Sequence, residues 1–349
     1  MKIKLFFAFL LHLIFIAKGQ FYYPLKQDAS DFAKRTLLVQ IQEEEPLIIK
    51  KLEKLYTDKA DLEKKRNDYR ELIAKHNEWI RIAISKYYKI NSKIEFKSKS
   101  DIEDILKDVK ILRKYAVLNT GWKNEYHYKG TERSPIEVYG LVAYVAEASD
   151  RHLVDLRRDK DHKTDYIFKI MFPTDDIVLS DFVFAIQQFN FHINLAGSIG
   201  PTLERYRTLL YLPKFNRAGF EVIKQKTLLL PQSSIPTELQ DTLKSAYGYP
   251  LQYVSGKFYE EAIDHQFARH TYITMAWSDK QMAFAYFVVN ASEGIILAEL
   301  GKKPQEVVFD NYALGKSKSE EGYVDYKQKM GFSFVNLIEI KKILNLQAK

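Results

Sequence analysis

The sequence contains no cysteine. Disulfide bonds, catalysis by a thiolate and zinc sites built from cysteine are therefore excluded. A lipid anchor attached through cysteine is excluded for the same reason. If the chain is exported, its hydrophobic core must stabilise it without covalent cross-links.

Long hydrophobic runs are also missing after the N-terminal segment MKIKLFFAFLLHLIFIAKGQ. Lys2 and Lys4 precede an apolar run over 5–17, which is well short of the about 20 residues needed to cross a bilayer. Ala17-Lys18-Gly19 has the small-x-small pattern of a cleavage site. We therefore expect residues 1–19 to be a cleaved signal peptide. An uncleaved membrane anchor is the alternative.

The signal peptide predicts an exported chain, periplasmic or extracellular, with no integral membrane segment once the peptide is removed. The chain has no strong excess of one charge either. Its formal net charge is +8, and without Lys2, Lys4 and Lys18 this becomes 8 − 3 = +5. Since the basic residues are spread along the chain, we do not expect a nucleic-acid partner.

Residues 20–118 read mainly as helix. Pro46 fits the first turn of a helix, where its missing N–H costs little. From residue 46 to residue 90, apolar and aromatic side chains recur every three to four residues between charged runs. This pattern predicts one long helix with a single buried seam, packed as a coiled-coil-like hairpin or bundle. Such a region is suited to self-association or to binding a protein partner.

Two further helices are expected to flank the long one. The first begins at Asp28 or Ser30 and runs toward Glu44. The second follows Ser100 and Glu103, which have the spacing of a capping box. Together with the long helix, they define the predicted N-terminal helical region, 20–118.

Residues 119–349 read mainly as strands, in keeping with an aromatic content of 14%. The segments 134–148, 165–172 and 270–289 predict antiparallel strands, the last as a hairpin. Segment 180–196 is apolar and ambiguous, and its second half alternates like a strand. We find no internal repeat and no clear parallel βαβ order. The predicted fold class is α+β: a helical N-terminal region, then a mostly antiparallel β-rich domain with one or two short helices.

The segment EEAIDHQFARH, which ends at His270, concentrates acids and histidines. Glu261 and His265 are the candidate catalytic pair, with Asp264 as the residue that orients them. Asp264, His265 and His270 are the candidate metal ligands, and His192 could join them from a neighbouring strand. The two histidines of the segment are five positions apart, or about 140° around a helix, which differs from the HExxH zinc motif. The spacing favours a solvated surface, and no cofactor is expected.

Aromatic residues offer a second kind of candidate site. Trp122, Tyr126 and Tyr128 follow one another closely and could stack on a glycan or a peptide. The sequence contains no complete catalytic motif. We therefore expect an exported, non-enzymatic binding or assembly protein, with a helical spacer and a β-rich interaction module. The alternative is a secreted hydrolase, metal-assisted or not, with its site around 260–270.

Overall fold

A computed structural model describes residues 26–108, 110–129, 132–145, 166–172, 177–198, 219–278 and 283–302. The predicted signal peptide, 1–19, lies outside these ranges. The labelled helices are α2 (Lys26–Lys34), α3 (Pro46–Leu55), α4 (Lys59–Tyr87), α5 (Lys99–Lys107), α6 (Leu179–Ser198), α8 (Thr237–Tyr247) and α9 (Gly256–Asp264). The strands are β1 (Thr36–Gln40), β2 (Ile94–Lys97), β3 (Tyr115–Lys129), β4 (Glu132–Val145), β5 (Tyr166–Phe172), β6 (Thr227–Pro231), β7 (Leu251–Val254), β8 (His270–Ser278), β9 (Ala283–Asn290) and β10 (Ile296–Lys302). The chain is therefore an α+β protein.

The first sheet has five strands in the order β2-β1-β3-β4-β5. Strand β1 pairs in parallel with β2 and β3, while β3, β4 and β5 form an antiparallel meander. Helices α3 and α4 connect β1 to β2, and α5 connects β2 to β3. β1 is an apolar run because both of its faces are covered: Leu37 and Val39 join the main core, and Leu38 packs with Ile102 in a smaller core under α5.

The second sheet repeats this plan. Its order is β7-β6-β8-β9-β10. β6, like β1 in the first sheet, is the central strand of the three that run parallel, and it pairs with β7 and β8. Strands β8, β9 and β10 are antiparallel. Helix α8 connects β6 to β7, and α9 connects β7 to β8. The two sheets therefore share strand order, strand directions and the order of strands and crossover helices along the chain.

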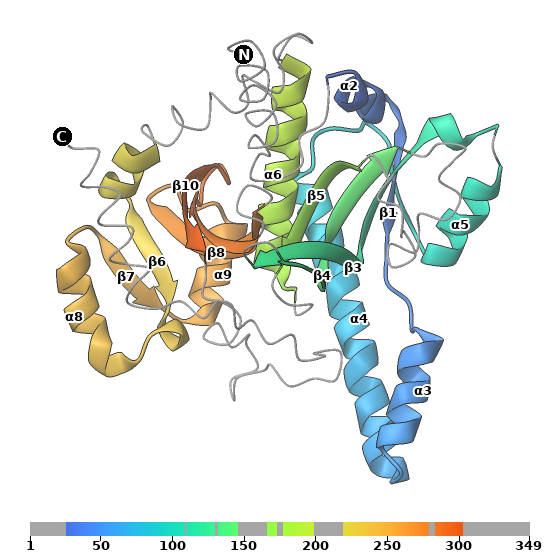
Figure 1. Cartoon of the computed structure of the whole chain (residues 1–349), viewed down its shortest axis with the longest axis horizontal. Helices are drawn as coiled ribbons and strands as arrows, with labels where there is room; N and C mark the ends of the chain where they lie inside the picture. Colours follow the sequence, from blue (N-terminus) through green and yellow to red (C-terminus); the bar gives the residue numbers. More distant parts are fainter. Residues whose placement is uncertain are drawn as a thin grey trace, which may run out of the picture.

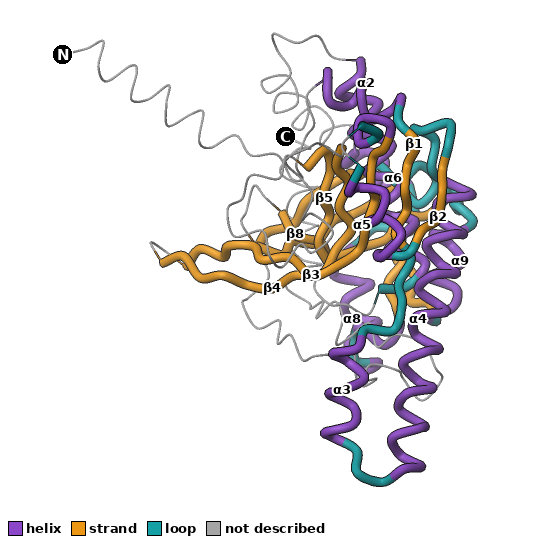
Figure 2. Tube along the Cα trace, turned by 90° about the vertical axis from the view of Figure 1, so that its right-hand side faces the viewer, coloured by secondary structure: helices purple, strands orange, loops and turns teal. Residues whose placement is uncertain are grey.

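One main hydrophobic core includes buried side chains from both sheets. Helix α6 lies between them and packs against α2, α4 and α9 (Figure 1). The antiparallel β3–β4 ribbon extends away from the body, and α3 with the first half of α4 projects in another direction (Figure 2). None of the helices in the described ranges is both long and apolar enough to cross a bilayer.

The predicted helix over 46–90 is two helices. It breaks at residues 56–58, where Asp58 caps α4 by accepting from the backbone N–H groups of Ala60 and Asp61. Ser98, and not Ser100, is the cap of α5, and it shares a capping box with Asp101. The acidic residue of this capping box is Asp101, the third residue of α5, and not Glu103 as the sequence suggested.

Several expectations for the strands were wrong. Residues 36–40 form a strand where a helix toward Glu44 was expected, and residues 180–196 lie in helix α6. In the predicted β region, four of the six strand pairings are antiparallel, but β6 pairs in parallel with β7 and β8, which was not expected, and both sheets are mixed. The expected boundary between residues 118 and 119 falls inside β3, which pairs with β1, so the first sheet contains strands from both sides of that boundary.

Candidate functional site

Four polar side chains meet at the carboxyl end of β1. Nε2 of Gln42 lies 3.2 Å from Nε2 of His76 and also donates to the hydroxyl of Tyr139. Oγ1 of Thr120 lies 3.2 Å from the same imidazole nitrogen. Since an amide nitrogen only donates, Nε2 of His76 accepts, and the neutral ring carries its proton on Nδ1. These residues come from the loop after β1, from α4, from β3 and from β4.

Two more amide side chains lie at the same end of β1, on the other face of the sheet. Alternation along the strands places Gln40 with Leu38, and Asn119 with Val117, on the face covered by α5. Gln40 is 8% exposed and Asn119 is 2% exposed. Among the described residues, Oε1 of Gln40 and Oδ1 of Asn119 have no hydrogen-bond partner. We call these six residues (Gln40, Gln42, His76, Asn119, Thr120 and Tyr139) the β1-edge site.

The β1-edge site is uncharged at neutral pH. Burial lowers the pKa of His76 to about 4, against a smaller opposing effect of hydrogen bonding with Asn77. The imidazole also packs edge-on against Phe182 of α6, with ring centroids 5.0 Å apart. The other five side chains are amides or hydroxyls. The site can therefore donate and accept hydrogen bonds, but it offers no formal charge to a metal ion or an anion.

The loop after β1 is fixed by α4. Oδ1 of Asn77 accepts from the backbone N–H of Gln42 at 2.8 Å, and Nδ2 of Asn77 donates to the Gln42 carbonyl at 2.9 Å. Further along the loop, the backbone N–H of Glu45 donates to the hydroxyl of Tyr69 at 3.0 Å. Gln42 and Asn77 are partly exposed, so this anchored loop forms the outer rim of the site.

The acidic candidates of the EEAIDHQFARH segment lie on or beside α9 and make contacts of other kinds. The carboxylate of Asp264 is 3.0 Å from Nζ of Lys86 and accepts from the hydroxyl of Tyr87 at 3.0 Å, so it joins α9 to α4. Glu261 lies 3.8 Å from Lys257, one turn earlier in α9. The side chain of His265 is 59% exposed and lies 3.8 Å from Asp264.

The remaining histidine candidates lie elsewhere. His270 opens β8, where burial and the nearby charge of Lys226 lower its pKa. His192 is on α6 and not on a strand, and burial lowers its pKa to about 3. In the described part of the chain, no three His, Asp or Glu side chains are grouped so that they could hold a metal ion.

The aromatic candidates Trp122, Tyr126 and Tyr128 belong to β3, and their backbones pair with Tyr139, Pro135 and Arg133 of β4. Their side chains lie outside the described residues. β3 therefore runs from the β1-edge site directly into this aromatic stretch.

No protein-family model, curated protein or solved structure matches this chain. The β1-edge site was missed at the sequence level because its residues are far apart in the chain and form no charged motif. The signal that could have found it is Gln40, a polar residue at the carboxyl end of an apolar strand that precedes a crossover. In open α/β sheets, ligands bind at this kind of place, where the connections from neighbouring strands leave in opposite directions.

Proposed function

We propose that this protein is an exported, non-enzymatic binding protein whose β1-edge site takes a neutral, hydroxyl-rich ligand, such as a short saccharide. The observation that carries the proposal is the pair of buried amide oxygens on Gln40 and Asn119. Buried polar atoms in folded proteins nearly always have a hydrogen-bond partner, so two neighbouring oxygens without one need an explanation. A bound ligand whose hydroxyl groups donate hydrogen bonds to these oxygens would explain them.

The chemistry of the site suits a saccharide. Each sugar hydroxyl both donates and accepts, and the amides of Gln40, Gln42 and Asn119 do the same. Trp122, Tyr126 and Tyr128 follow Thr120 along the same strand, β3, and aromatic residues are the type on which sugar rings stack.

A binding role fits the site better than catalysis. His76, with its pKa near 4, is neutral at pH 7, and no carboxylate stands beside it in the β1-edge site to act as its partner. The alternative of a secreted hydrolase would rest on Glu261 and His265. Their contacts favour the binding role, because Glu261 pairs with Lys257 and His265 lies largely in solvent.

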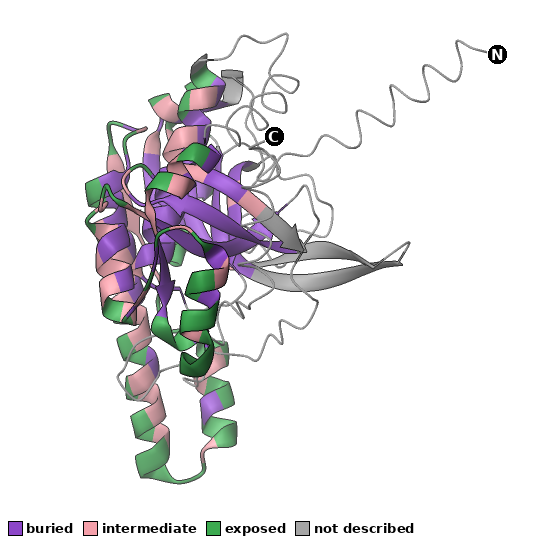
Figure 3. Ribbon diagram, turned by 90° about the vertical axis from the view of Figure 1, so that its left-hand side faces the viewer, coloured by how far each residue is buried: buried purple, intermediate pink, exposed green. Residues whose placement is uncertain are grey.

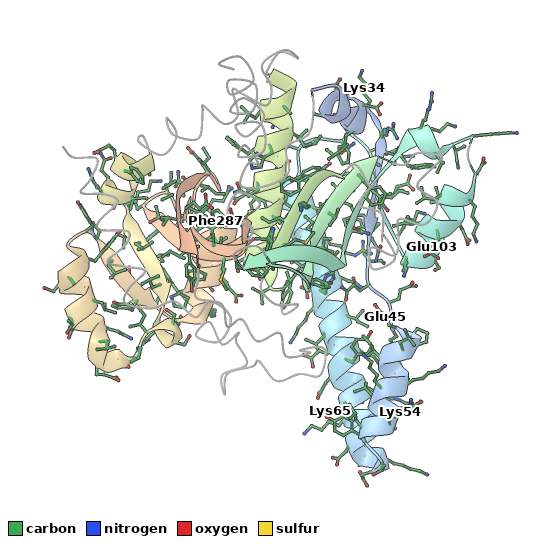
Figure 4. All side chains as sticks on the ribbon, in the orientation of Figure 1. Lys34, Glu45, Lys54, Lys65, Glu103 and Phe287 are labelled. Carbon is green, nitrogen blue, oxygen red and sulfur yellow. The ribbon has the colours of Figure 1, made fainter. Side chains whose placement is uncertain are left out.

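The helical projection, formed by α3 and the first half of α4, is the proposed assembly element. Leu47 is 66% exposed and Leu55 is 61% exposed, although both are large apolar side chains of α3. The projection is largely exposed in Figure 3, and Lys54 and Lys65 extend from it in Figure 4. These features support self-association or a protein partner at this element. Light scattering of the wild type and of the variant Leu47→Gln with Leu55→Gln tests it: a dimer that becomes a monomer supports the proposal.

A glycan array followed by isothermal titration calorimetry tests the ligand proposal. The wild-type chain should bind a neutral oligosaccharide, and Gln40→Leu should weaken binding at least tenfold, because it removes an amide and leaves the volume nearly unchanged. Thr274→Val is the matched control: it removes a buried polar group from β8 in the other sheet and should leave affinity unchanged.

Three results would contradict the proposal. The first is a glycan array with no signal. The second is equal affinity in the wild type and Gln40→Leu. The third is binding to a peptide library without binding to glycans, which would replace the saccharide by a peptide.

A further inference from the structure

The two halves of the chain agree in more than strand order. β1 and β6 are both five residues long, β2 and β7 both four, and α5 and α9 both nine. The connection after the second strand of each sheet is also of similar length, spanning 98–114 in the first half and 255–269 in the second. Such agreement in element lengths is not required by a shared topology.

The helix caps agree as well. The residue directly after β2 is Ser98, which accepts from the backbone N–H of Asp101 at 3.1 Å. The residue directly after β7 is Ser255, which accepts from the backbone N–H of Phe258 at 3.2 Å. Each serine therefore caps the helix that comes directly after its strand.

The strand registers also coincide. Thr36 pairs with Tyr115, and Thr227 pairs with His270, so each central strand begins with threonine opposite the first residue of its neighbour. Both central strands start Thr-Leu-Leu. Trp122 follows Tyr115 by the same number of sequence positions as Trp277 follows His270. Their partners in the next strands are both aromatic: Tyr139 and Phe284, respectively.

We infer that the chain is a tandem repeat of one α/β unit and that the units have diverged, so that the first alone keeps a polar edge for a neutral ligand. The second part of this inference rests on the proposed function. The register assigns a counterpart in the second sheet to four of the six residues of the β1-edge site. Gln40, Asn119, Thr120 and Tyr139 correspond to Pro231, Thr274, Met275 and Phe284.

The second unit shows what this fold needs at these places when no ligand is held. All four counterparts are buried, as are the four residues of the first unit, but three of the counterparts are apolar. The polar side chains of the first unit are therefore not a requirement of the fold. The largely apolar edge of the second unit predicts one ligand per chain and not two.

The units also differ in the connection after the central strand. It spans 41–93 in the first unit and 232–250 in the second, so the first connection is more than twice as long. The additional length accommodates α3 and most of α4, including His76 and the anchored loop, in the first unit alone. The longer connection thus supplies two residues of the site, Gln42 and His76.

The test replaces residues of the first unit by their counterparts. Asn119→Thr with Tyr139→Phe changes two buried polar positions to the residues of the second unit. We expect the Tm of this double variant to stay within about 3 °C of wild type, and saccharide affinity to fall at least tenfold. Calorimetry of the wild type should give one site per chain. The reverse change, Phe284→Tyr, buries a hydroxyl in an edge without amides and should lower the Tm by more than the forward change.

The outcomes separate the two ideas. A fall in Tm of more than about 8 °C for the forward variant would show that these side chains are structural, and it would overturn the inferred divergence. Two equal sites per chain would overturn it as well. If no saccharide binds the wild type, the proposed function fails. The inferred divergence of the two units is then tested by the Tm values of the forward and reverse variants alone.

Discussion

Replacing Asp264 by Ala should weaken the junction between the two units. Asp264 ends α9 in the second unit, and its carboxylate meets Lys86 and Tyr87 at the end of α4 in the first. The side chain of Asp264 is only 12% exposed, whereas that of Lys86 is 48% exposed. The hydroxyl of Tyr87 also donates to the backbone carbonyl of Asp264, a contact that the substitution keeps.

The expected cost is the sum of two lost contacts. An ion pair with a half-exposed lysine contributes about 0.5 kcal/mol. Removal of a charged acceptor from a partly buried tyrosine hydroxyl costs about 1.5 kcal/mol, because the remaining carbonyl compensates only in part. We therefore expect Asp264→Ala to lower the free energy of unfolding by about 2 kcal/mol and the Tm by about 4 °C.

Two milder variants divide this cost. Asp264→Asn keeps an acceptor for the tyrosine and loses only the ion pair, so it should cost about 0.5 kcal/mol. Lys86→Met removes the same ion pair and should cost the same. The double variant of these two should be no less stable than either one alone, because the pair can be lost only once. Glu261→Ala is the control, expected within about 0.5 kcal/mol of wild type.

Urea denaturation followed by tryptophan fluorescence and by circular dichroism measures these values and checks that the two units unfold together. The reasoning is refuted if Asp264→Ala lies within about 0.5 kcal/mol of wild type. It is also refuted if Lys86→Met costs as much as Asp264→Ala, since the tyrosine would then contribute nothing.

Three further predictions concern buried histidines, one glycine and the alternative function. Burial lowers the pKa of His76 to about 4 and that of His192 to about 3. The unfolded chain therefore takes up protons below about pH 6.5 that the folded chain does not. The contribution of these histidines to stability should be full above about pH 6.5 and fall as the pH drops toward 4, by up to about 1.4 kcal/mol per pH unit for each histidine. Urea titrations at pH 5 and pH 7 measure this slope, and His192→Phe should halve it. Gly294 has a φ of +69°, and a Cβ there would overlap the side chain of Gln187, so Gly294→Ala should lower stability by about 2 kcal/mol or more in thermal unfolding. Elemental analysis should find no bound metal, and His265→Ala should leave a broad hydrolase screen unchanged; a stoichiometric metal lost in that variant would favour the hydrolase.

The sequence predicted the elements whose pattern is local. The hairpin of β8 and β9 was expected from two apolar runs around a polar turn. Helix α6 was misread because it is buried on nearly all sides. Its polar residues, such as Gln187 and His192, are buried together with its apolar ones, so no polar stripe marks a solvent-facing side, and its second half alternated like a strand.

The parallel halves of the sheets could not be read locally. β1 is five residues long and lies between two helices, so its apolar run resembled part of a helix face. The β1-edge site was hidden for a related reason. Gln42, His76, Thr120 and Tyr139 are brought together only when β1 pairs with β3 and α4 crosses the sheet, and nothing in their spacing along the chain encodes that.

Comparison of the two units changes how each candidate residue is weighed. An acidic, histidine-rich segment attracts attention as a motif, yet Asp264 ends α9, the counterpart of α5, and joins the units. By contrast, Gln40 and Asn119 belong to no motif, but they carry amides where the second unit has Pro231 and Thr274. Because both units must satisfy the same backbone geometry, a difference between equivalent buried positions cannot be explained by the fold alone. The residues that differ in this way, together with the longer connection between β1 and β2, are where selection for a ligand would act.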